Sequence, residues 1–172
     1  MAKMTEEKGL NKRHVILVCQ GTGCVSGGSE HIFSALKDAL ETSGNGKDIL
    51  VKRTGCHGFC QQGPLAVVEP QGIFYTKVTR EDIPEILQSI SSGGKPLERL
   101  LYRDTFTDKP ILHYHDIPFY WKQQRTILKY CGSIDPEDID DYSEVGGYRA
   151  LQKAISAMSP EDIIGEVKES GL

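Results

Sequence analysis

Two stretches decide the fold and the chemistry of this chain: HVILVCQGTGC at residues 14–24 and ILVKRTGCHGFC at residues 49–60. Each begins as a short apolar run and ends among glycines and two cysteines. Short apolar runs predict buried strands, and glycine-rich stretches predict loops. We therefore expect four thiols to meet at one end of a small α/β domain. They form two close pairs: Cys19 with Cys24, and Cys56 with Cys60.

The residues around these stretches predict the element order β-α-β-β-β-α. Phe33, Leu36 and Leu40 recur at helical spacing, and Ser29 is the expected N-cap of that helix, with Gly44 as its stop. A parallel strand pair with a crossover helix, followed by a hairpin and a helix, is a thioredoxin-like arrangement. Strands are expected at residues 14–19, 48–52, 65–69 and 73–78, with a loop at residues 20–28.

The second helix of this domain has a clear start signal. Asp82 is the expected N-cap, with Pro84 in the first turn and Glu85 in the capping-box position. Further along, a helix is expected at residues 118–130. Asp135 and Ser159 are each followed by proline and acidic residues, which favours two more helix starts there.

Three segments follow from these patterns. We expect a flexible arm at residues 1–13, the thioredoxin-like domain at residues 14–95, and a mostly α-helical extension at residues 96–172. Residues 1–104 carry 13 basic and 12 acidic side chains, net +1, whereas residues 105–172 carry 7 and 12, net −5. This charge asymmetry agrees with two distinct segments.

The composition restricts the class of protein. The net charge of −4 gives no reason to expect a nucleic-acid partner. No apolar run approaches the ~20 residues of a membrane span, so we expect no membrane insertion. The polar N-terminus lacks the apolar core of a signal peptide, which predicts a cytoplasmic protein. In the cytoplasm, clustered cysteines are more often metal ligands or catalytic groups than disulfides.

Four cysteine thiolates are the ligand set of a [2Fe–2S] cluster, and two close pairs supply one pair per iron. The spacing C-x4-C and C-x3-C differs from the plant-type pattern. Glycines allow backbone N–H groups to approach the sulfurs. Among the glycines of the two loops are Gly21, Gly23, Gly55, Gly58 and Gly63.

Other interpretations of the pairs stay open on spacing alone. A zinc ion bound by four cysteines would make the domain a structural docking module, although C-x2-C is the commoner zinc spacing. A redox disulfide would usually show C-x-x-C. A dinucleotide loop needs G-x-G-x-x-G, which Gly21, Gly23 and Gly27 miss by one residue. The cluster is the favoured interpretation.

The motifs CQGTGC and TGCHGFCQQGP, with the following VVEPQGIFY, resemble the thioredoxin-like [2Fe-2S] ferredoxins over about residues 14–100. That domain also occurs in the small subunit of complex I and of NAD-linked hydrogenases. The resemblance implies one-electron transfer through a [2Fe-2S] cluster. It also implies that the cluster has four cysteine ligands: Cys19, Cys24, Cys56 and Cys60.

The later motifs HDIPFYWKQQR, KYCGSIDPEDIDDY and GGYRALQKAI resemble the start of the flavoprotein (beta) subunit of complex I and of NAD-dependent, often electron-bifurcating hydrogenases. The resemblance implies a relay domain with the other subunits of such a complex as partners; a homodimer is also compatible. This chain shows no flavin loop and no NADH site, so we expect FMN and NAD only in a longer parent subunit. We do not expect this chain alone to oxidise NADH.

Several single residues are candidates for a functional or structural role. His57 lies between two cysteines and could replace one as a ligand, but four cysteines suffice, so we expect a loop residue near the cluster. His113 and His115 are expected on one strand face, and Cys131 as a buried inert thiol. Pro64 lies where thioredoxin folds have a cis-proline. The aromatic residues Phe119, Tyr120 and Trp121 are expected either in the core or in an exposed docking patch.

Overall fold

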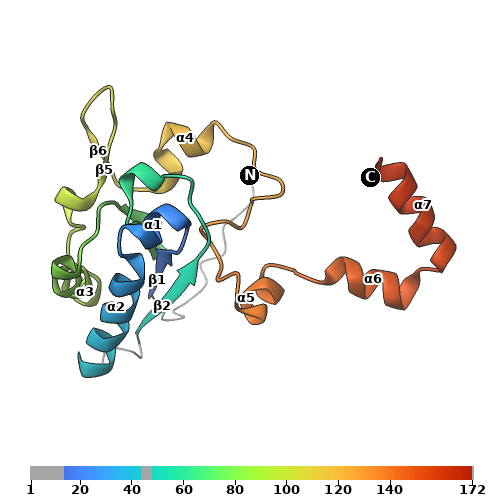
Figure 1. Ribbon diagram of the computed structural model, residues 1–172, viewed down its shortest axis with the longest axis horizontal. Helices are drawn as coiled ribbons and strands as arrows, with labels where there is room; N and C mark the ends of the chain where they lie inside the picture. Colours follow the sequence, from blue (N-terminus) through green and yellow to red (C-terminus); the bar gives the residue numbers. More distant parts are fainter. Residues whose placement is uncertain (1–13, 44–47, 172) are drawn as a thin grey trace, which may run out of the picture. The chain divides into compact units, whose positions relative to one another are not determined.

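The computed structural model describes residues 14–43 and 48–171, and its course is shown in Figure 1. The contacts divide the chain into two compact units, Met1–Ile134 and Asp135–Leu172, which are described separately. The predicted arm at residues 1–13 and the predicted stop at Gly44 lie outside the described residues. Of the helices described, none is both long and apolar enough to span a bilayer.

The first unit is built on a four-stranded sheet with the strand order β2-β1-β3-β4. β1 and β2 run parallel and are joined by the crossover helix α2, whereas β3 is antiparallel to both β1 and β4. This is the predicted thioredoxin-like β-α-β-β-β-α order. The strands are β1 (His14–Cys19), β2 (Ile49–Thr54), β3 (Ala66–Glu69) and β4 (Ile73–Tyr75).

The residues between β1 and α2 differ from the prediction. Residues 20–28 were expected to form a loop, but a short helix, α1 (Thr22–Ser26), begins there. The reason is that Val25 and Gly27 donate their N–H groups to the carbonyls of Gly21 and Gly23. In α2 (Ser29–Ser43), Ser29 is the first helical residue instead of the expected N-cap, and its hydroxyl donates to the Gln20 side chain.

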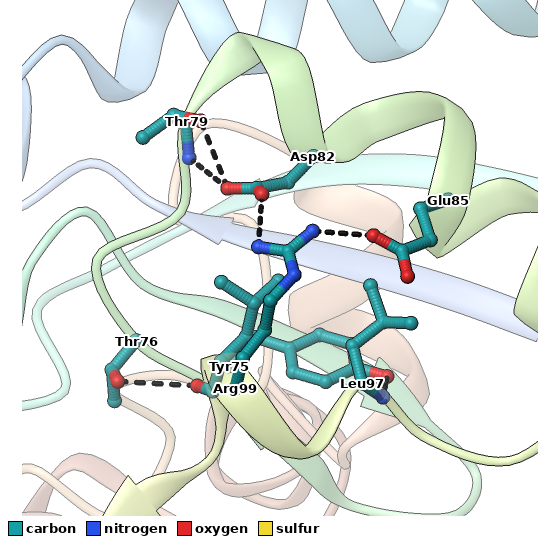
Figure 2. Close-up of polar contacts among 8 residues, drawn as sticks. Tyr75, Thr76, Thr79, Asp82, Glu85, Leu97 and Arg99 are labelled. Carbon is teal, nitrogen blue, oxygen red and sulfur yellow. Dashed lines mark hydrogen bonds and ion pairs between the residues drawn. The ribbon is translucent and has the colours of Figure 1, made fainter.

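Asp82 is the N-cap residue of α3 (Ile83–Ser91), as predicted, but its side chain does not cap that helix, and the capping box lies one turn earlier than predicted. A 3-10 turn, η3 (Arg80–Asp82), precedes the helix, and Thr79 caps that turn. Asp82 accepts hydrogen bonds from the Thr79 N–H and hydroxyl, while Glu85 pairs with Arg99 instead of capping, as Figure 2 shows. Pro84 lies in the first turn of α3, as predicted.

Both faces of the sheet are covered, which explains why β1 is apolar at almost every position. Successive side chains of a strand point to opposite faces. Ile16 and Val18 pack with α2 and α3 in one core cluster. Leu17 and Cys19 point to the other face and pack with Phe74 and with later residues of the chain.

The second face is covered by residues that follow the predicted domain boundary at residue 95. Tyr102, Ile117 and Tyr120 are buried there against Leu17 and Val67. The compact unit therefore runs to Ile134. The covering segment contains η4 (Glu98–Leu100), β5 (Tyr102–Arg103), β6 (Pro110–Ile111), η5 (Tyr114–Asp116) and α4 (Pro118–Trp121).

The helix predicted at residues 118–130 is wrong beyond its first turn, since α4 ends at Trp121. A helix needs a surface against which to bury its apolar stripe. Ile127 and Leu128 would belong to that stripe, but both are exposed in this unit. Without burial of these side chains, turns replace the helix.

The second unit contains three helices among its described residues: α5 (Ile139–Glu144), α6 (Arg149–Ala157) and α7 (Pro160–Ser170). Asp138 caps α5, so the start predicted at Asp135 lies three residues too early; the Asp135 N–H instead donates to the Asp141 carboxylate. Ser159 caps α7 as predicted, in a capping box with Asp162. Neither α6 nor α7 has a buried residue.

Candidate metal centre

The four cysteines of the two predicted pairs lie on two loops at one edge of the sheet. Cys19 is the last residue of β1, and it stands opposite Thr54, the last residue of the parallel strand β2. The chain therefore leaves both strands at the same edge. Cys24 follows in α1, Cys56 lies in the loop after β2, and Cys60 opens the 3-10 turn η2 (Cys60–Gln62). The sulfurs of Cys56 and Cys60 are 3.8 Å apart.

The two loops interlock at glycines. A Cβ at Gly21 would lie 2.9 Å from the Cys56 Cβ, and a Cβ at Gly23 would lie 2.9 Å from the Cys60 Cβ. A Cβ at Gly63 would lie 2.8 Å from the Cys24 sulfur. Real Cβ atoms do not approach so closely, so only glycine permits this contact between the loops.

Backbone N–H groups point at the sulfurs, as expected from the glycine-rich loops. Gly21 donates to the Cys19 Sγ at 3.5 Å, and Gly58 donates to the Cys56 Sγ at 3.3 Å. Gly58 has a φ of +86°, which favours glycine. Gly55 differs from the other four predicted glycines, because a Cβ there would meet nothing within 4 Å.

The thiols influence one another's ionisation. A hydrogen bond from Cys24 lowers the pKa of Cys19 to about 6, although burial alone would raise it. Hydrogen bonds from the N–H groups of His57 and Gly21 also lower the Cys19 pKa. The same bond raises the pKa of Cys24, because it holds the proton. Burial raises the pKa of Cys56 in spite of the Gly58 N–H. The pair on the first loop thus readily forms one thiolate, the state in which cysteine binds metals.

Exposure divides the four thiols. Cys19 and Cys24 are each 1% exposed, whereas Cys56 and Cys60 are exposed to solvent. A hollow of about 360 Å³ adjoins Cys60 and is lined in part by Phe59, Tyr102 and Phe119. The site is therefore closed on the β1 side and open on the side of the second loop.

The donor set and the interlocked loops fit a two-iron cluster, in which each iron takes two thiolates. Within residues 14–43 and 48–171, no three Cys, His, Asp or Glu side chains are arranged around a single metal-ion position. All five cysteines are free thiols, so none of the four is held in a disulfide.

His57 lies between the two cysteines of the second loop, and its side chain is buried. Its ring packs edge-on against Phe74, Tyr114 and Tyr120. Burial lowers the pKa of His57 to about 4, and the positive charge of Arg125 acts in the same direction. The imidazole is therefore neutral near pH 7, and it serves as packing between the loop and the covering segment.

Two residues that position this loop were missed by the sequence analysis. The Tyr120 hydroxyl donates to the His57 carbonyl at 3.0 Å. A Cβ at Gly132, where φ is +91°, would lie 2.4 Å from the His57 ring. The aromatic run around Tyr120 and the glycine at 132 were visible in the sequence, but nothing in it placed them beside residue 57.

The remaining predicted residues have varied positions. Pro64 follows a cis peptide bond, as suspected. Cys131 is half-buried, and its carbonyl accepts from Arg125. His113 and His115 do not share a strand face, because His115 lies in η5. The strand β6 ends at Ile111, before both histidines, and the Asp116 and Ile117 N–H groups bond back to the carbonyls of residues 113 and 114 to form the η5 turn. Of the aromatic run, Tyr120 is in the core, whereas Phe119 and Trp121 are exposed.

Known proteins that are similar to this chain include 2Fe-2S ferredoxins. The family model described as thioredoxin-like [2Fe-2S] ferredoxin matches residues 4–91. A 2Fe-2S ferredoxin of Clostridium pasteurianum is 34% identical over 99 residues, which cover 53% of this chain and 97% of that protein. A crystal structure of the thioredoxin-like [2Fe-2S] ferredoxin of Aquifex aeolicus aligns with a TM-score of 0.48 and 30% identity, over 54% of this chain and 98% of that one.

A fourth similarity is to one part of a longer protein. The NADP-reducing hydrogenase subunit HndC of Solidesulfovibrio fructosivorans is 47% identical over 51 residues. Those residues are 30% of this chain but 10% of the hydrogenase subunit. The match therefore concerns a small part of a much longer protein.

Proposed function

The chain belongs to the thioredoxin-like [2Fe-2S] ferredoxin family, and we propose that Cys19, Cys24, Cys56 and Cys60 together hold its cluster. When bound, the cluster supplies one-electron redox chemistry. The observation that carries the ligand assignment is the interlock of the two cysteine loops at Gly21, Gly23 and Gly63. It brings residues from two separate parts of the chain to one place without any other evident need for such close contact.

The residues around the thiols have opposite effects on the charge of the site. The N–H groups of Gly21 and Gly58 stabilise negative charge on sulfur, which favours the reduced state. The burial of Cys19 and Cys24 disfavours added negative charge. Electron exchange is expected at the second loop, because the exposure of Cys56 and Cys60 gives a partner the shortest approach.

The wider role is also a proposal. We infer a relay domain of an NAD(P)-linked hydrogenase or NADH dehydrogenase, with other subunits of that complex as partners and a cytoplasmic location. The support is the similarity to the NADP-reducing hydrogenase subunit, together with the motifs of residues 115–155. FMN and NAD belong, in this proposal, to a longer parent subunit.

The ligand set is tested by changing each of the four cysteines to serine in the reconstituted protein. We expect every variant to lose or alter the visible absorption and the electron paramagnetic resonance spectrum of the dithionite-reduced form. Cys131→Ser is the matched control and should leave both spectra unchanged. An unaltered spectrum for Cys56→Ser would remove Cys56 from the ligand set, and a colourless protein with stoichiometric zinc would favour the zinc-bound docking module.

The redox role is tested by potentiometric titration of the wild-type protein. Clusters held by four cysteines reach potentials of about −400 mV, whereas histidine ligands raise the potential. We expect a negative potential, because the buried His57 is not among the proposed ligands. A positive potential would contradict this part of the proposal.

A further inference from the structure

We propose that a pocket in the covering segment binds a small phosphorylated compound with a planar aromatic ring, of the class of a mononucleotide. The pocket has a volume of about 420 Å³, within the range of small-molecule sites. Aromatic side chains, cationic side chains and two uncharged polar side chains line it: Tyr114, Trp121, Arg125, Lys129, Gln123 and Ser133. The inference goes beyond the proposed electron transfer and does not depend on which residues hold the cluster.

The charge of the pocket is opposite to that of the chain. The whole chain has a net charge of −4, yet the pocket is lined by Arg125, Lys129 and His115 and by no carboxylate. Glu69 interacts electrostatically with His115 of the lining: burial raises the pKa of Glu69, and His115 acts against this increase. The pocket is thus the kind of local positive field that attracts an anion.

Arg125 is held in position before any ligand arrives. Its Nη1 donates to the Cys131 carbonyl at 3.3 Å, and its guanidinium lies 5.6 Å from the centre of the Tyr120 ring. In the described part of the chain, Arg125 and Lys129 form no ion pair with a carboxylate. A guanidinium has five N–H donors, so most of those of Arg125 are available to phosphate oxygens.

The aromatic part of the ligand has its own surface. The Trp121 side chain is 63% exposed although its neighbour Tyr120 is in the core. Tyr114, which is half-buried, also lines the pocket. Exposed aromatic rings beside cationic groups are suited to stacking with a nucleotide base. Phosphate binding alone would not use Trp121, which is why we infer a compound with both parts.

The pocket also adjoins the packing of the second cysteine loop. The rings of Tyr114 and Tyr120, which line the pocket, contact His57 beside Cys56. The Tyr120 hydroxyl donates to the His57 carbonyl. A bound ligand therefore lies one layer of side chains from the proposed metal ligands.

The test is isothermal titration calorimetry of the cluster-loaded full chain with AMP, adenosine and inorganic phosphate. We expect AMP to bind saturably at one site, with adenosine and phosphate each weaker by about tenfold or more, since each lacks one half of the contacts. Trp121 is the only tryptophan of the chain, so its fluorescence should change with the same midpoint.

Arg125→Gln should weaken AMP binding by about tenfold or more, because a charge-assisted hydrogen bond is lost. Lys109→Gln is the matched control: it removes an exposed cation outside the pocket lining and should bind AMP like the wild type. If Arg125→Gln fails to fold by circular dichroism, Lys129→Gln replaces it with the same expectation. No saturable AMP binding, wild-type affinity in the pocket variants, or phosphate binding as tight as AMP would each overturn the proposal.

Discussion

The glycines at positions 21 and 23 let two loops that are far apart in the sequence lie in contact, with no room for a Cβ between them. Each packs against a different cysteine of the second loop, Cys56 and Cys60 respectively. The requirement is therefore steric and local. A small side chain at either position would push the two halves of the proposed ligand set apart.

Gly23→Ala tests this requirement. Because Gly23 lies in α1, alanine should by itself stabilise the helix by about 1 kcal/mol. We nevertheless expect a lower cluster content and faster loss of iron to a chelator, since the new Cβ would lie 2.9 Å from that of Cys60. Gly55→Ala is the control and should behave like the wild type, and equal cluster retention in both variants would contradict the steric argument.

Tyr120→Phe tests the link between the covering segment and the second loop. The change leaves the buried His57 carbonyl without the hydroxyl that donates to it, which should lower the free energy of unfolding by about 1–3 kcal/mol. Urea denaturation measures this loss, and the spectrum of the reduced cluster should shift as the loop relaxes. Tyr102→Phe is the matched control, because its buried ring has no hydroxyl hydrogen bond among the described residues. A loss of stability no larger than that of the control would exclude the hydrogen bond as a positioning contact.

Single elements show how far the sequence could be interpreted. β1 was predictable with its bounds because HVILVC is apolar and ends at a glycine-rich loop, and α7 was predictable from Ser159, Pro160 and Asp162. α1 was not, since a five-residue helix among glycines has no apolar period. The end of α4 at Trp121 depends on what Ile127 and Leu128 can pack against, and this is information about neighbours in space.

The metal centre shows the same limit. Close spacing revealed both cysteine pairs and the need for glycine around them. Nothing local indicated that Tyr120, 63 residues after His57, would donate to its carbonyl. The capping box at α3 was misplaced for a related reason: the local pattern pairs Asp82 with Glu85, but in the fold Arg99 pairs with both carboxylates.

Asp82→Asn tests the start of α3. Burial raises the pKa of Asp82, but the N–H of Thr79, the guanidinium of Arg99 and the Thr79 hydroxyl outweigh it and lower the pKa below its usual value. The variant should lose about 1–3 kcal/mol of unfolding free energy at pH 7. Glu85→Gln, which removes the exposed partner of Arg99, should lose less.

The pH dependence of that loss has a definite sign. A carboxylate with a lowered folded-state pKa stabilises the fold above its unfolded pKa of about 3.9, and this contribution disappears as the pH falls through the folded value. The difference between wild type and Asp82→Asn should therefore persist from pH 7 to about pH 5 and shrink below about pH 3.9. Urea denaturation of the cluster-free proteins measures it, and a difference that grows in acid would contradict the assignment.

The whole chain has two units, and the first includes far more than the family match of residues 4–91. The second face of its sheet is closed by Ile117 and Tyr120, which lie well beyond that match. A chain ending at residue 134 should therefore keep the cluster spectrum and the unfolding midpoint of the first unit.

A chain ending at residue 95 should be less stable by at least about 6 kcal/mol. It lacks four large buried side chains, and burying each contributes about 1.5–3 kcal/mol. They are Leu100, Tyr102, Ile117 and Tyr120. Urea denaturation of the two shortened chains makes the comparison. Equal stability would mean that the covering segment is a passive attachment to the domain.

The uneven exposure of the four cysteines also decides how the protein is damaged. In the cluster-free state, a charged alkylating reagent should modify Cys56 and Cys60 first. Cys19 has the lower pKa, but it is 1% exposed, and a reagent that cannot reach a thiolate cannot use its reactivity. Mass spectrometry should thus find that Cys56 and Cys60 are alkylated fast and that Cys19 and Cys24 are alkylated slowly. The half-buried Cys131 is the remaining free thiol. Oxidative ageing should begin at the same outer pair and leave the inner pair intact until the loops separate.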